Sequence, residues 1–395
     1  MCGIIGAVGK VDVAPRLIEG LERLEYRGYD SAGIATVFDG CIERRRAKGR
    51  IKNLSETISL DPIGGKIGIG HTRWATHGKP TEANAHPHGD ENVALVHNGI
   101  IENFVQLRAE LEQAGRCFKT ETDTEVIVHL ISRMLSMGKN KREAVKEALK
   151  SLEGAFALAI LFSGDDEVLF VARRGSPLAI GYGEGEMFVG SDSLALAPFT
   201  QRVSYLEEGD WAEINREGSV IFDSGNNIVQ REIYSTAVSG VELGKGNFEH
   251  FMLKEIFDQP SVIGETLSAF INPVSKTIEL PEIESRLLDV SRVTVVACGS
   301  SFYAGLTAKY WIEKYAKLSV ECDIASEFRY REFEVEPGGL AIFISQSGET
   351  ADTLAALRYC KDQDQFTLAI VNVAESTMAR EADAFLMTMR DLKLV

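Results

Sequence analysis

The spacing of apolar residues along the first 240 positions predicts a mixture of short strands and a few helices. Apolar runs of strand length alternate with Gly, Asn and Asp turns, over residues 155–162, 168–172, 179–182, 187–189, 211–214 and 220–222. Helical spacing of apolar residues predicts helices over 16–26, 122–134 and 141–152. We expect an α+β domain of stacked antiparallel sheets with two or three helices.

From about residue 240 the pattern changes. A Gly-rich linker is expected over 240–247, followed by a polar helix from Phe251 to Phe257 and Pro260. Beyond it, non-alternating apolar runs over 293–297, 340–344, 367–371 and 384–389 are separated by helical stretches over 302–315, 350–361 and 377–382. Strands that are apolar on both faces indicate a parallel sheet covered by helices on both sides. We therefore predict an α+β domain at 1–240, a connecting segment at 241–285 and a doubly wound α/β domain at 286–395.

Composition restricts the partners of the chain. The 395 residues carry 42 basic and 58 acidic side chains, a formal net charge of −16, which disfavours nucleic acid and anionic lipid. No apolar run approaches the roughly 20 residues of a membrane helix, and no secretion signal is visible. The six cysteines form no C-x-x-C pair and are typical of reduced thiols. We expect a cytoplasmic protein.

Cys2 has an unusual position. Removal of Met1 would leave it with a free α-amine of pKa about 7.7–8.0, able to accept the proton of the neighbouring thiol near neutral pH. One residue would then supply both a nucleophile and its base. Position alone is weak support, because a small cysteine can also stand at an ordinary N-terminus.

The stretch from 71 to 99 adds the other parts of an acyl-transfer site. Arg73 can bind a carboxylate with two hydrogen bonds, and an Asn98-Gly99 turn after a strand at 93–96 could stabilise an oxyanion. Asp123, one residue after the expected helix N-cap, could hold an α-ammonium group. Taken singly, these residues also fit a surface ion pair, a hairpin turn and a carboxylate at a helix N-terminus.

Five of the seven histidines lie between positions 71 and 97, which raises the possibility of a metal site. The spacing His86-Pro-His88 does not place two imidazoles one helical turn apart, and no cysteine or acidic cluster nearby has ligand spacing. We interpret these histidines as hydrogen-bonded groups around a polar site, and expect neither a metal nor a cofactor.

Two strand-to-helix junctions of the second half carry hydroxyl groups. They read Cys298-Gly-Ser-Ser and Ser345-Gln-Ser-Gly-Glu-Thr, and helix N-termini with small hydroxyl residues can bind a phosphate group. Either turn alone could consist of ordinary N-caps. The dinucleotide and P-loop fingerprints are absent, so a sugar phosphate fits better than a nucleotide.

Six separated motifs resemble the N-terminal-nucleophile glutaminase domain of the glucosamine-6-phosphate synthase family, over residues 2–6, 24–33, 71–78, 84–88, 97–103 and 121–125. The resemblance implies that Cys2 attacks the amide of glutamine. It also implies that Asn98 and Gly99 form the oxyanion hole. The residues that it assigns to glutamine binding are Arg73, Trp74, Thr76, His77 and Asp123.

The second half is similar to the sugar-isomerase (SIS) domain of the same family, and residues 250–260 are similar to its connecting segment. The resemblance implies transfer of ammonia to fructose 6-phosphate, giving glucosamine 6-phosphate, and a homodimer formed through SIS domains. It assigns the sugar phosphate to Ser300, Ser301, Ser345, Gln346, Ser347 and Thr350.

Family members continue with a second SIS domain, to which this sequence shows no counterpart, and residues 390–395 do not resemble the continuation. We therefore expect glutamine hydrolysis without formation of the amino sugar. Amidophosphoribosyltransferase and asparagine synthetase B are rivals of the same class, but the Ser-rich turns argue against both. A rival of another class is a non-catalytic sugar-phosphate-binding regulatory protein.

Overall fold

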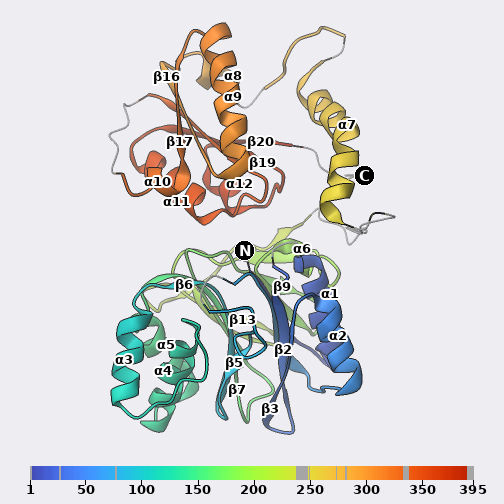
Figure 1. Ribbon diagram of the computed structural model, residues 1–395, viewed down its shortest axis with the longest axis vertical. Coiled ribbons are helices and arrows are strands. Elements are labelled where there is room, and N and C mark those ends of the chain that lie inside the picture. Colours follow the sequence, from blue (N-terminus) through green and yellow to red (C-terminus); the bar gives the residue numbers. More distant parts are fainter. Residues whose placement is uncertain are drawn as a thin grey trace. The chain divides into compact units, whose positions relative to one another are not determined.

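The computed structural model describes residues 2–25, 28–75, 78–236, 248, 250–272, 274–280, 283–331 and 338–388. The chain divides into two compact units, Met1–Glu242 and Leu243–Val395, and each is described by itself (Figure 1). The expected linker at 240–247 lies outside the described residues.

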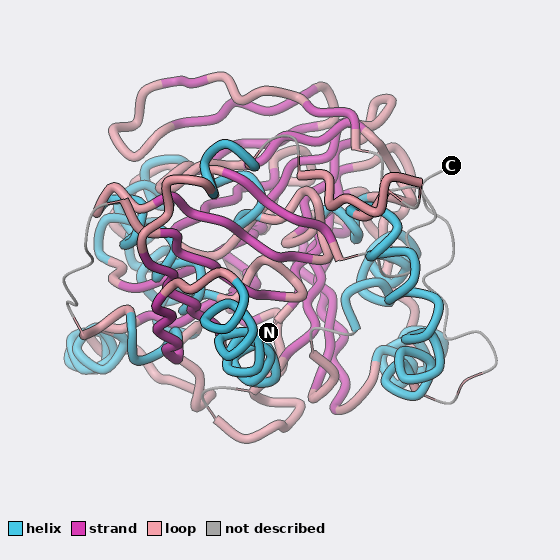
Figure 2. The backbone as a smooth tube through the Cα atoms, turned by 90° about the horizontal axis from the view of Figure 1, so that it is seen from above, coloured by secondary structure: helices cyan, strands magenta, loops and turns pink. Residues whose placement is uncertain are grey.

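The first unit contains two antiparallel sheets, drawn in magenta with the other strands in Figure 2. The larger has the order β15-β11-β9-β10-β1-β4-β2-β3, so the N-terminal strand lies at its centre. Its strands are β1 (Gly3–Val8), β2 (Ser31–Phe38), β3 (Cys41–Lys48), β4 (Ile67–Arg73), β9 (Ala179–Tyr182), β10 (Met187–Gly190), β11 (Arg202–Tyr205) and β15 (Tyr234–Ser235).

The second sheet has the order β14-β13-β12-β8-β7-β6-β5. Its two longest strands, β6 and β7, pair along their whole length, from Val93 opposite Phe162 to Ile101 opposite Gly154. The strands are β5 (His88–Gly89), β6 (Val93–Ile101), β7 (Gly154–Phe162), β8 (Leu169–Arg174), β12 (Trp211–Asn215), β13 (Gly218–Phe222) and β14 (Ile228–Val229).

Three apolar cores hold this unit in four layers. Ile69 and Val96 belong to the core between the two sheets. Helices on the outer faces complete two further cores, as the flanking helices in Figure 1 show. The eight-stranded sheet is covered by α1 (Ala14–Leu24), α2 (Ile51–Leu60) and α6 (Ser193–Leu196), and the seven-stranded sheet by α3 (Phe104–Gln113), α4 (Glu125–Ser136) and α5 (Lys141–Ser151). The expected α+β class with stacked antiparallel sheets is confirmed.

The number of helices predicted for this unit was too low. The described residues form six helices where two or three were expected, because α2 and α3 each bury only two apolar side chains, too few for a clear periodic signal. Helix α1 begins two residues early, with a proline in its first turn, and ends at Leu24 rather than at residue 26. Helix α5 matches its prediction closely, and Asn140 and Glu143 form a capping box at its start.

The second unit contains a five-stranded parallel sheet in the order β17-β16-β18-β19-β20. Apolar cores cover both faces, as expected for a doubly wound α/β domain. Edge strand β17 was not predicted, because it buries only Val320 and lacks an apolar run. The strands are β16 (Arg292–Ala297), β17 (Ser319–Ile324), β18 (Leu340–Ser345), β19 (Phe366–Val371) and β20 (Ala384–Met387), and the helices are α8 (Glu284–Leu287), α9 (Gly299–Tyr315), α10 (Ala325–Phe328), α11 (Ala351–Asp362) and α12 (Thr377–Glu381).

Helix α7 (Phe251–Phe270) corrects the expectation of a short helix near Pro260. It continues ten residues past this proline, so Pro260 lies inside the helix. A proline removes one backbone hydrogen bond, while the residues on either side can keep theirs. Among the helices of the described residues, none is long and apolar enough to cross a membrane.

Candidate active site

Cys2 lies directly before the central strand β1, beside the end of β4. The pairing of Gly3 with Thr72 brings the residues that flank these two positions together. The Cys2 thiol accepts a hydrogen bond from the backbone N–H of Trp74 at 3.3 Å and donates to the carbonyl oxygen of Trp74 at 3.5 Å. The order of the strands therefore places Cys2 next to the 73–75 segment.

The surroundings of Cys2 do not by themselves favour a thiolate. Burial raises the pKa of the thiol, and the backbone N–H of Trp74 and the charge of Arg73 only partly oppose this effect. A thiol of this kind needs a nearby base to become nucleophilic. The environment of Cys2 is thus compatible with an assisting amine.

Arg73 ends β4 with a side chain that is only 4% exposed. Its guanidinium donates to the carbonyl oxygens of Lys79 at 3.3 Å and Gly78 at 3.5 Å. Asp30, which sequence reasoning did not single out, holds the following segment. Its N–H donates to the carbonyl of Arg73 at 3.0 Å, and its carboxylate accepts from the N–H of Ala75 at 2.9 Å.

Asn98 and Gly99 do not form the expected turn, because β6 continues through both of them to Ile101. Their partners on β7 are Ala157 and Phe156. Asn98 Nδ2 donates to the carbonyl oxygen of Cys2 at 3.2 Å, so its amide lies beside the cysteine. Gly99 has φ +124°, and a Cβ at this position would collide with the carbonyl of the opposite strand. The strand is therefore distorted at the place where an oxyanion hole was predicted.

Asp123 is buried, 5% exposed, and its carboxylate accepts from the N–H of Ile101 at 2.9 Å. The expected N-cap at Thr122 is wrong, because α4 begins at Glu125 and the residue before it is Thr124. The side chain of Glu125 instead accepts from the N–H groups of Lys119 and Thr120. Asp123 thus belongs to the loop before the helix.

Four of the predicted cluster of histidines are buried between β4, β5 and β6. Each forms a hydrogen bond, with Thr122 and Thr124 as the hydroxyl partners of three of them. Among the described residues, no group of three or more His, Cys, Asp or Glu side chains could hold a metal ion. The four histidines are His71, His86, His88 and His97.

Of the three remaining residues that were predicted to bind glutamine, the structure describes only Trp74. Trp74 is 45% exposed, and its ring meets that of Tyr29 edge to face at 5.7 Å between centroids. Thr76 and His77 lie outside the described residues. A cavity of about 290 Å³ elsewhere in this unit is lined by Lys146, Phe156 and other residues, and contains none of the predicted site residues.

The predicted phosphate site lies at the carboxyl ends of β16 and β18, which are neighbours in the sheet. The order of the five strands reverses between these two, and ligands of doubly wound sheets bind at such a point. Ser345 Oγ accepts from the N–H of Gly348 at 3.1 Å and lies 3.0 Å from Thr350 Oγ1. Ser347 Oγ accepts from the N–H of Glu349 at 3.2 Å. Both serines are buried.

The first junction is more open. Ser300 is exposed and Ser301 half-buried at the start of α9, and Gln346 is also exposed. Thr353 in the first turn of α11 connects the two junctions through a 4.0 Å contact of its hydroxyl with Cys298 Sγ. The structure thus brings the two predicted Ser-rich turns to one edge of the sheet.

Comparison with known proteins agrees with this two-part architecture. Residues 71–198 match the glutamine amidotransferase domain family, and residues 286–391 match the SIS domain family. A solved structure of glutamine phosphoribosylpyrophosphate amidotransferase from B. subtilis covers 98% of this chain and 91% of its own, with a TM-score of 0.52 and 20% identity. At this identity it supports the fold alone.

Sequence relatives resemble the chain along nearly its whole length. A glutamine–fructose-6-phosphate aminotransferase (isomerizing) of Zymomonas mobilis subsp. mobilis is 56% identical over 388 residues, which are 98% of this chain and 64% of the relative. The protein of that name from Brucella suis biovar 1 is 55% identical over 389 residues, with the same coverage. The chain spans about 64% of the length of these relatives. Over nearly its whole length the chain is thus similar to glutamine–fructose-6-phosphate aminotransferases, with a match to the glutamine amidotransferase domain family followed by a match to the SIS domain family.

Proposed function

We propose that the chain is a glutamine-dependent amidotransferase that releases ammonia from glutamine at Cys2. One observation carries the proposal: the Asn98 amide and the Trp74 backbone N–H both lie within hydrogen-bonding distance of Cys2, the first of its carbonyl oxygen and the second of its thiol. A nucleophile beside a polarised N–H group is the arrangement that acyl transfer requires. The sequence similarity supports the same reaction.

The proposed reaction begins after removal of Met1. The α-amine of Cys2 takes the proton of the thiol, and the sulfur forms a bond to the side-chain amide carbon of glutamine. The electron pair of the carbonyl moves to its oxygen, which accepts hydrogen bonds from Asn98 Nδ2 and the backbone of Gly99. Collapse of this intermediate breaks the C–N bond, and the α-ammonium protonates the leaving ammonia. Water then cleaves the thioester to glutamate and restores the thiol.

Two buried charges are proposed to hold the glutamine molecule. Arg73 would bind the α-carboxylate, and Asp123 the α-ammonium group. Both influence the pKa of Cys2, which supports their closeness to it. Trp74, Thr76 and His77 complete the proposed glutamine site.

As part of the whole enzyme, the chain is proposed to pass its ammonia to fructose 6-phosphate, giving glucosamine 6-phosphate, whereas by itself it is proposed to hydrolyse glutamine only. The name of the relatives supports this choice, and so does the pair of hydroxyl-rich turns at the edge of the parallel sheet. The residues proposed to surround the phosphate are Ser300, Ser301, Ser345, Gln346, Ser347 and Thr350.

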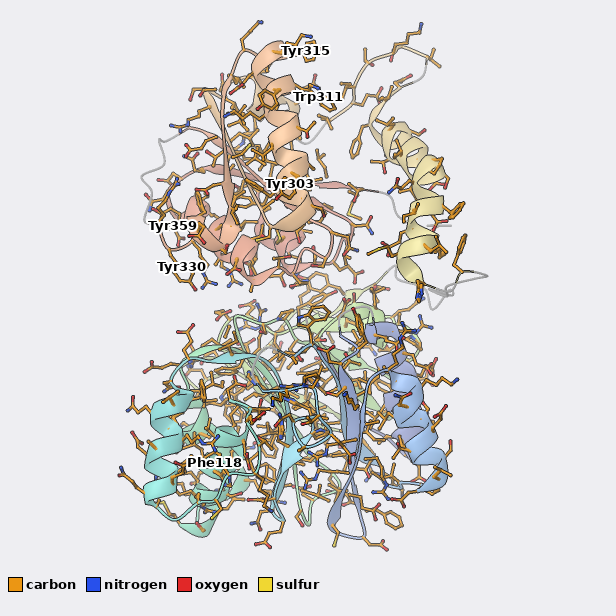
Figure 3. All side chains as sticks on the ribbon, in the orientation of Figure 1. Phe118, Tyr303, Trp311, Tyr315, Tyr330 and Tyr359 are labelled. Atoms are coloured by element: carbon orange, nitrogen blue, oxygen red, sulfur yellow. The ribbon has the colours of Figure 1, made fainter. Side chains whose placement is uncertain are left out.

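We also propose a homodimer formed through the SIS unit. Tyr303, Trp311 and Tyr315 follow one another along α9 (Figure 3), and these three side chains are 68%, 62% and 73% exposed. Large exposed aromatic side chains on one helix favour a protein contact. Sedimentation should show a dimer that Trp311→Glu dissociates, and an unchanged oligomeric state would contradict this surface. The cytoplasm remains the proposed compartment, consistent with six free cysteines.

Ammonia release from glutamine by the purified chain tests the main proposal. Cys2→Ala should abolish it, while Cys41→Ala, which alters an exposed thiol on β3, should leave it unchanged. Intact mass before and after treatment with a glutamine-mimicking electrophile should show loss of Met1 and one label at Cys2. Turnover that survives Cys2→Ala would refute the mechanism. Stabilisation by sugar phosphates without any ammonia release would favour the non-catalytic alternative.

A further inference from the structure

We propose that His71 is a positioning residue that determines which end of the Asn98 amide faces the reacting glutamine. The inference deepens the proposed function and rests on it. An asparagine side chain presents an acceptor at Oδ1 and two donors at Nδ2, and only the donor end can stabilise an oxyanion. Something in the protein must therefore hold the amide in the productive orientation.

His71 makes contact with the acceptor end of this amide. It lies on β4, fully buried, and its Nε2 is 3.0 Å from Asn98 Oδ1 and 3.0 Å from the carbonyl oxygen of His97. Asn98 Nδ2 points the other way, to the carbonyl oxygen of Cys2 at 3.2 Å. The amide is thus held at both ends.

A backbone carbonyl sets the proton position on the imidazole. The carbonyl oxygen of His97 can only accept hydrogen bonds, so the Nε2 of His71 that faces it must carry a proton. That N–H is shared with the Asn98 side-chain atom 3.0 Å away, which must then be the carbonyl oxygen. A rotated amide would place its NH2 group against the N–H of His71. The His97 carbonyl thus fixes the proton on His71, and this N–H fixes the orientation of the Asn98 amide.

The carbonyl oxygen of Cys2 requires the same orientation of the Asn98 amide, independently of His71. The Cys2 carbonyl also only accepts, so it requires the NH2 end of the amide. One hydrogen of Nδ2 is used in this bond, and the second has no acceptor among the described residues. This second hydrogen is the one available to the substrate oxygen.

The His71 ring is held in one plane and one charge state. It stacks on His86 with 4.1 Å between centroids and 19° between planes. Burial lowers the pKa of His71 to about 3, so the ring is neutral near pH 7. Its Nδ1 has no hydrogen-bond partner among the described residues, as expected for an unprotonated nitrogen that is not needed as a donor.

A purely space-filling role does not account for these contacts. A hydrophobic side chain could fill this space without burying an unpaired nitrogen, which costs free energy. What the imidazole adds to a hydrophobic ring here is the Nε2–H shared by His97 and Asn98.

The first test compares two substitutions of His71. His71→Phe keeps a ring but removes the N–H, and we expect kcat for ammonia release to fall about 10- to 100-fold with KM changed less than about threefold, a part of the 10²–10³-fold cost of losing an oxyanion donor. His71→Gln places an amide N–H at similar reach and should recover most of kcat. If the Phe variant does not fold, His71→Met, also without an N–H, takes its place with the same expectation.

The second test measures coupling to Asn98. If His71 acts through this amide, His71→Phe should change kcat less than about threefold in the Asn98→Ala background. His129→Phe is the matched control, because His129 is a buried histidine of α4 that contacts Phe118 and Glu125 rather than Asn98. It should leave kcat unchanged in both backgrounds.

The outcomes separate this inference from the proposed function. A wild-type chain that releases no ammonia would refute the proposed function. An active wild type with equal kcat in His71→Phe and His71→Gln would overturn the role of His71 alone. Additive losses in the double variant, or an equal loss in His129→Phe, would also overturn it, because each indicates a general effect on the fold.

Discussion

The two candidate sites of this chain are built in opposite ways. At Cys2, the contacting groups come from positions 72 and 96 residues away: pairing of β1 with β4 brings in Trp74, and stacking of the two sheets brings in Asn98. At the SIS edge, the hydroxyl of Ser345 bonds to a backbone N–H only three positions later. The first site depends on long-range strand order and sheet stacking, and the second on the local geometry of a strand-to-helix turn.

This difference determines how much each side chain should contribute. Around Cys2, each proposed contact to glutamine comes from a single donor or charge, so few groups could replace one another. At the SIS edge, several hydroxyls and helix N-terminal N–H groups would share one phosphate. Loss of one group should therefore be severe in the first site and mild in the second, and the following predictions are arranged by expected size.

The substitution Asn98→Ala should have the largest effect on activity. Removal of an oxyanion donor typically costs about 10²–10³ in turnover, so kcat for ammonia release should fall by about that factor while KM changes little. Steady-state kinetics with glutamine measures both. As a control, Asn103→Ala removes another asparagine from the loop after β6, whose amide bonds only to backbone groups near residue 152, and should retain turnover. Unchanged turnover in Asn98→Ala would remove this residue from the site.

Arg73→Lys should give the next largest effect, on binding rather than on turnover. A lysine keeps the positive charge but cannot make two parallel hydrogen bonds to a carboxylate, so we expect KM for glutamine to rise about tenfold or more. Arg142→Lys alters an exposed ion pair with Glu213 and serves as the control. If KM is equal in wild type and Arg73→Lys, the α-carboxylate does not bind there.

The contrast between the sites also explains what the sequence could predict. In the second half, non-alternating apolar runs and helix N-caps are local signals, and strands β16, β18 and β19 were predicted within one residue at each end. Edge strand β17 was missed because an exposed edge does not require an apolar run. Local sequence signals thus predict the buried strands of a parallel sheet well, but not an edge strand with few buried residues.

In the first half, strands β6 to β10, β12 and β13 were predicted at least in part, but β1 to β4 were not, and neither was the way in which the strands meet. Asn98-Gly99 looked like a turn, because Asn-Gly is a strong turn signal, yet pairing with β7 keeps both in a strand. Asp30 gave no signal of its own, and His71 stood out only as one of five clustered histidines, since their roles depend on strand order and on the stacking of the two sheets. Residue-type patterns singled out the proposed nucleophile and charges, while only the three-dimensional structure shows the groups that contact them.

The buried histidines should also make the two units differ, in how their stability depends on pH, and this effect should be smaller than those above. Burial lowers the pKa values of His71 and His88 to about 3, against about 6.5 for histidine in an unfolded chain. Each of these histidines makes its full contribution to the free energy of unfolding above about pH 6.5. This contribution is lost as the pH falls toward 3, because the unfolded state takes up the proton first. Between pH 7 and pH 5 the loss should be about 1–2 kcal/mol for each histidine.

Urea unfolding followed by hydrogen exchange can assign this loss to its unit. Peptides of the first unit should lose protection between pH 7 and pH 5, whereas the SIS domain at 286–391, which contains no histidine, should not. Carboxylates contribute mainly below this range: burial favours neutral Glu125, but the nearby His129 ring and hydrogen bonds from Lys119 and Thr120 lower its pKa to about 2. Equal losses in both units would contradict the assignment to the histidines.

The smallest effect should come from Ser347→Ala. Its hydroxyl already accepts from the N–H of Glu349, and the proposed phosphate would retain the hydroxyls of the other turn residues and the helix N-terminal N–H groups. We therefore expect fructose 6-phosphate affinity to weaken only about three- to tenfold by calorimetry, about 1 kcal/mol. Fructose without phosphate should show no such difference between wild type and variant. An unchanged affinity for fructose 6-phosphate would leave Ser347 with a capping role only, whereas a loss above 100-fold would show that the SIS site depends on single groups as strongly as the Cys2 site does.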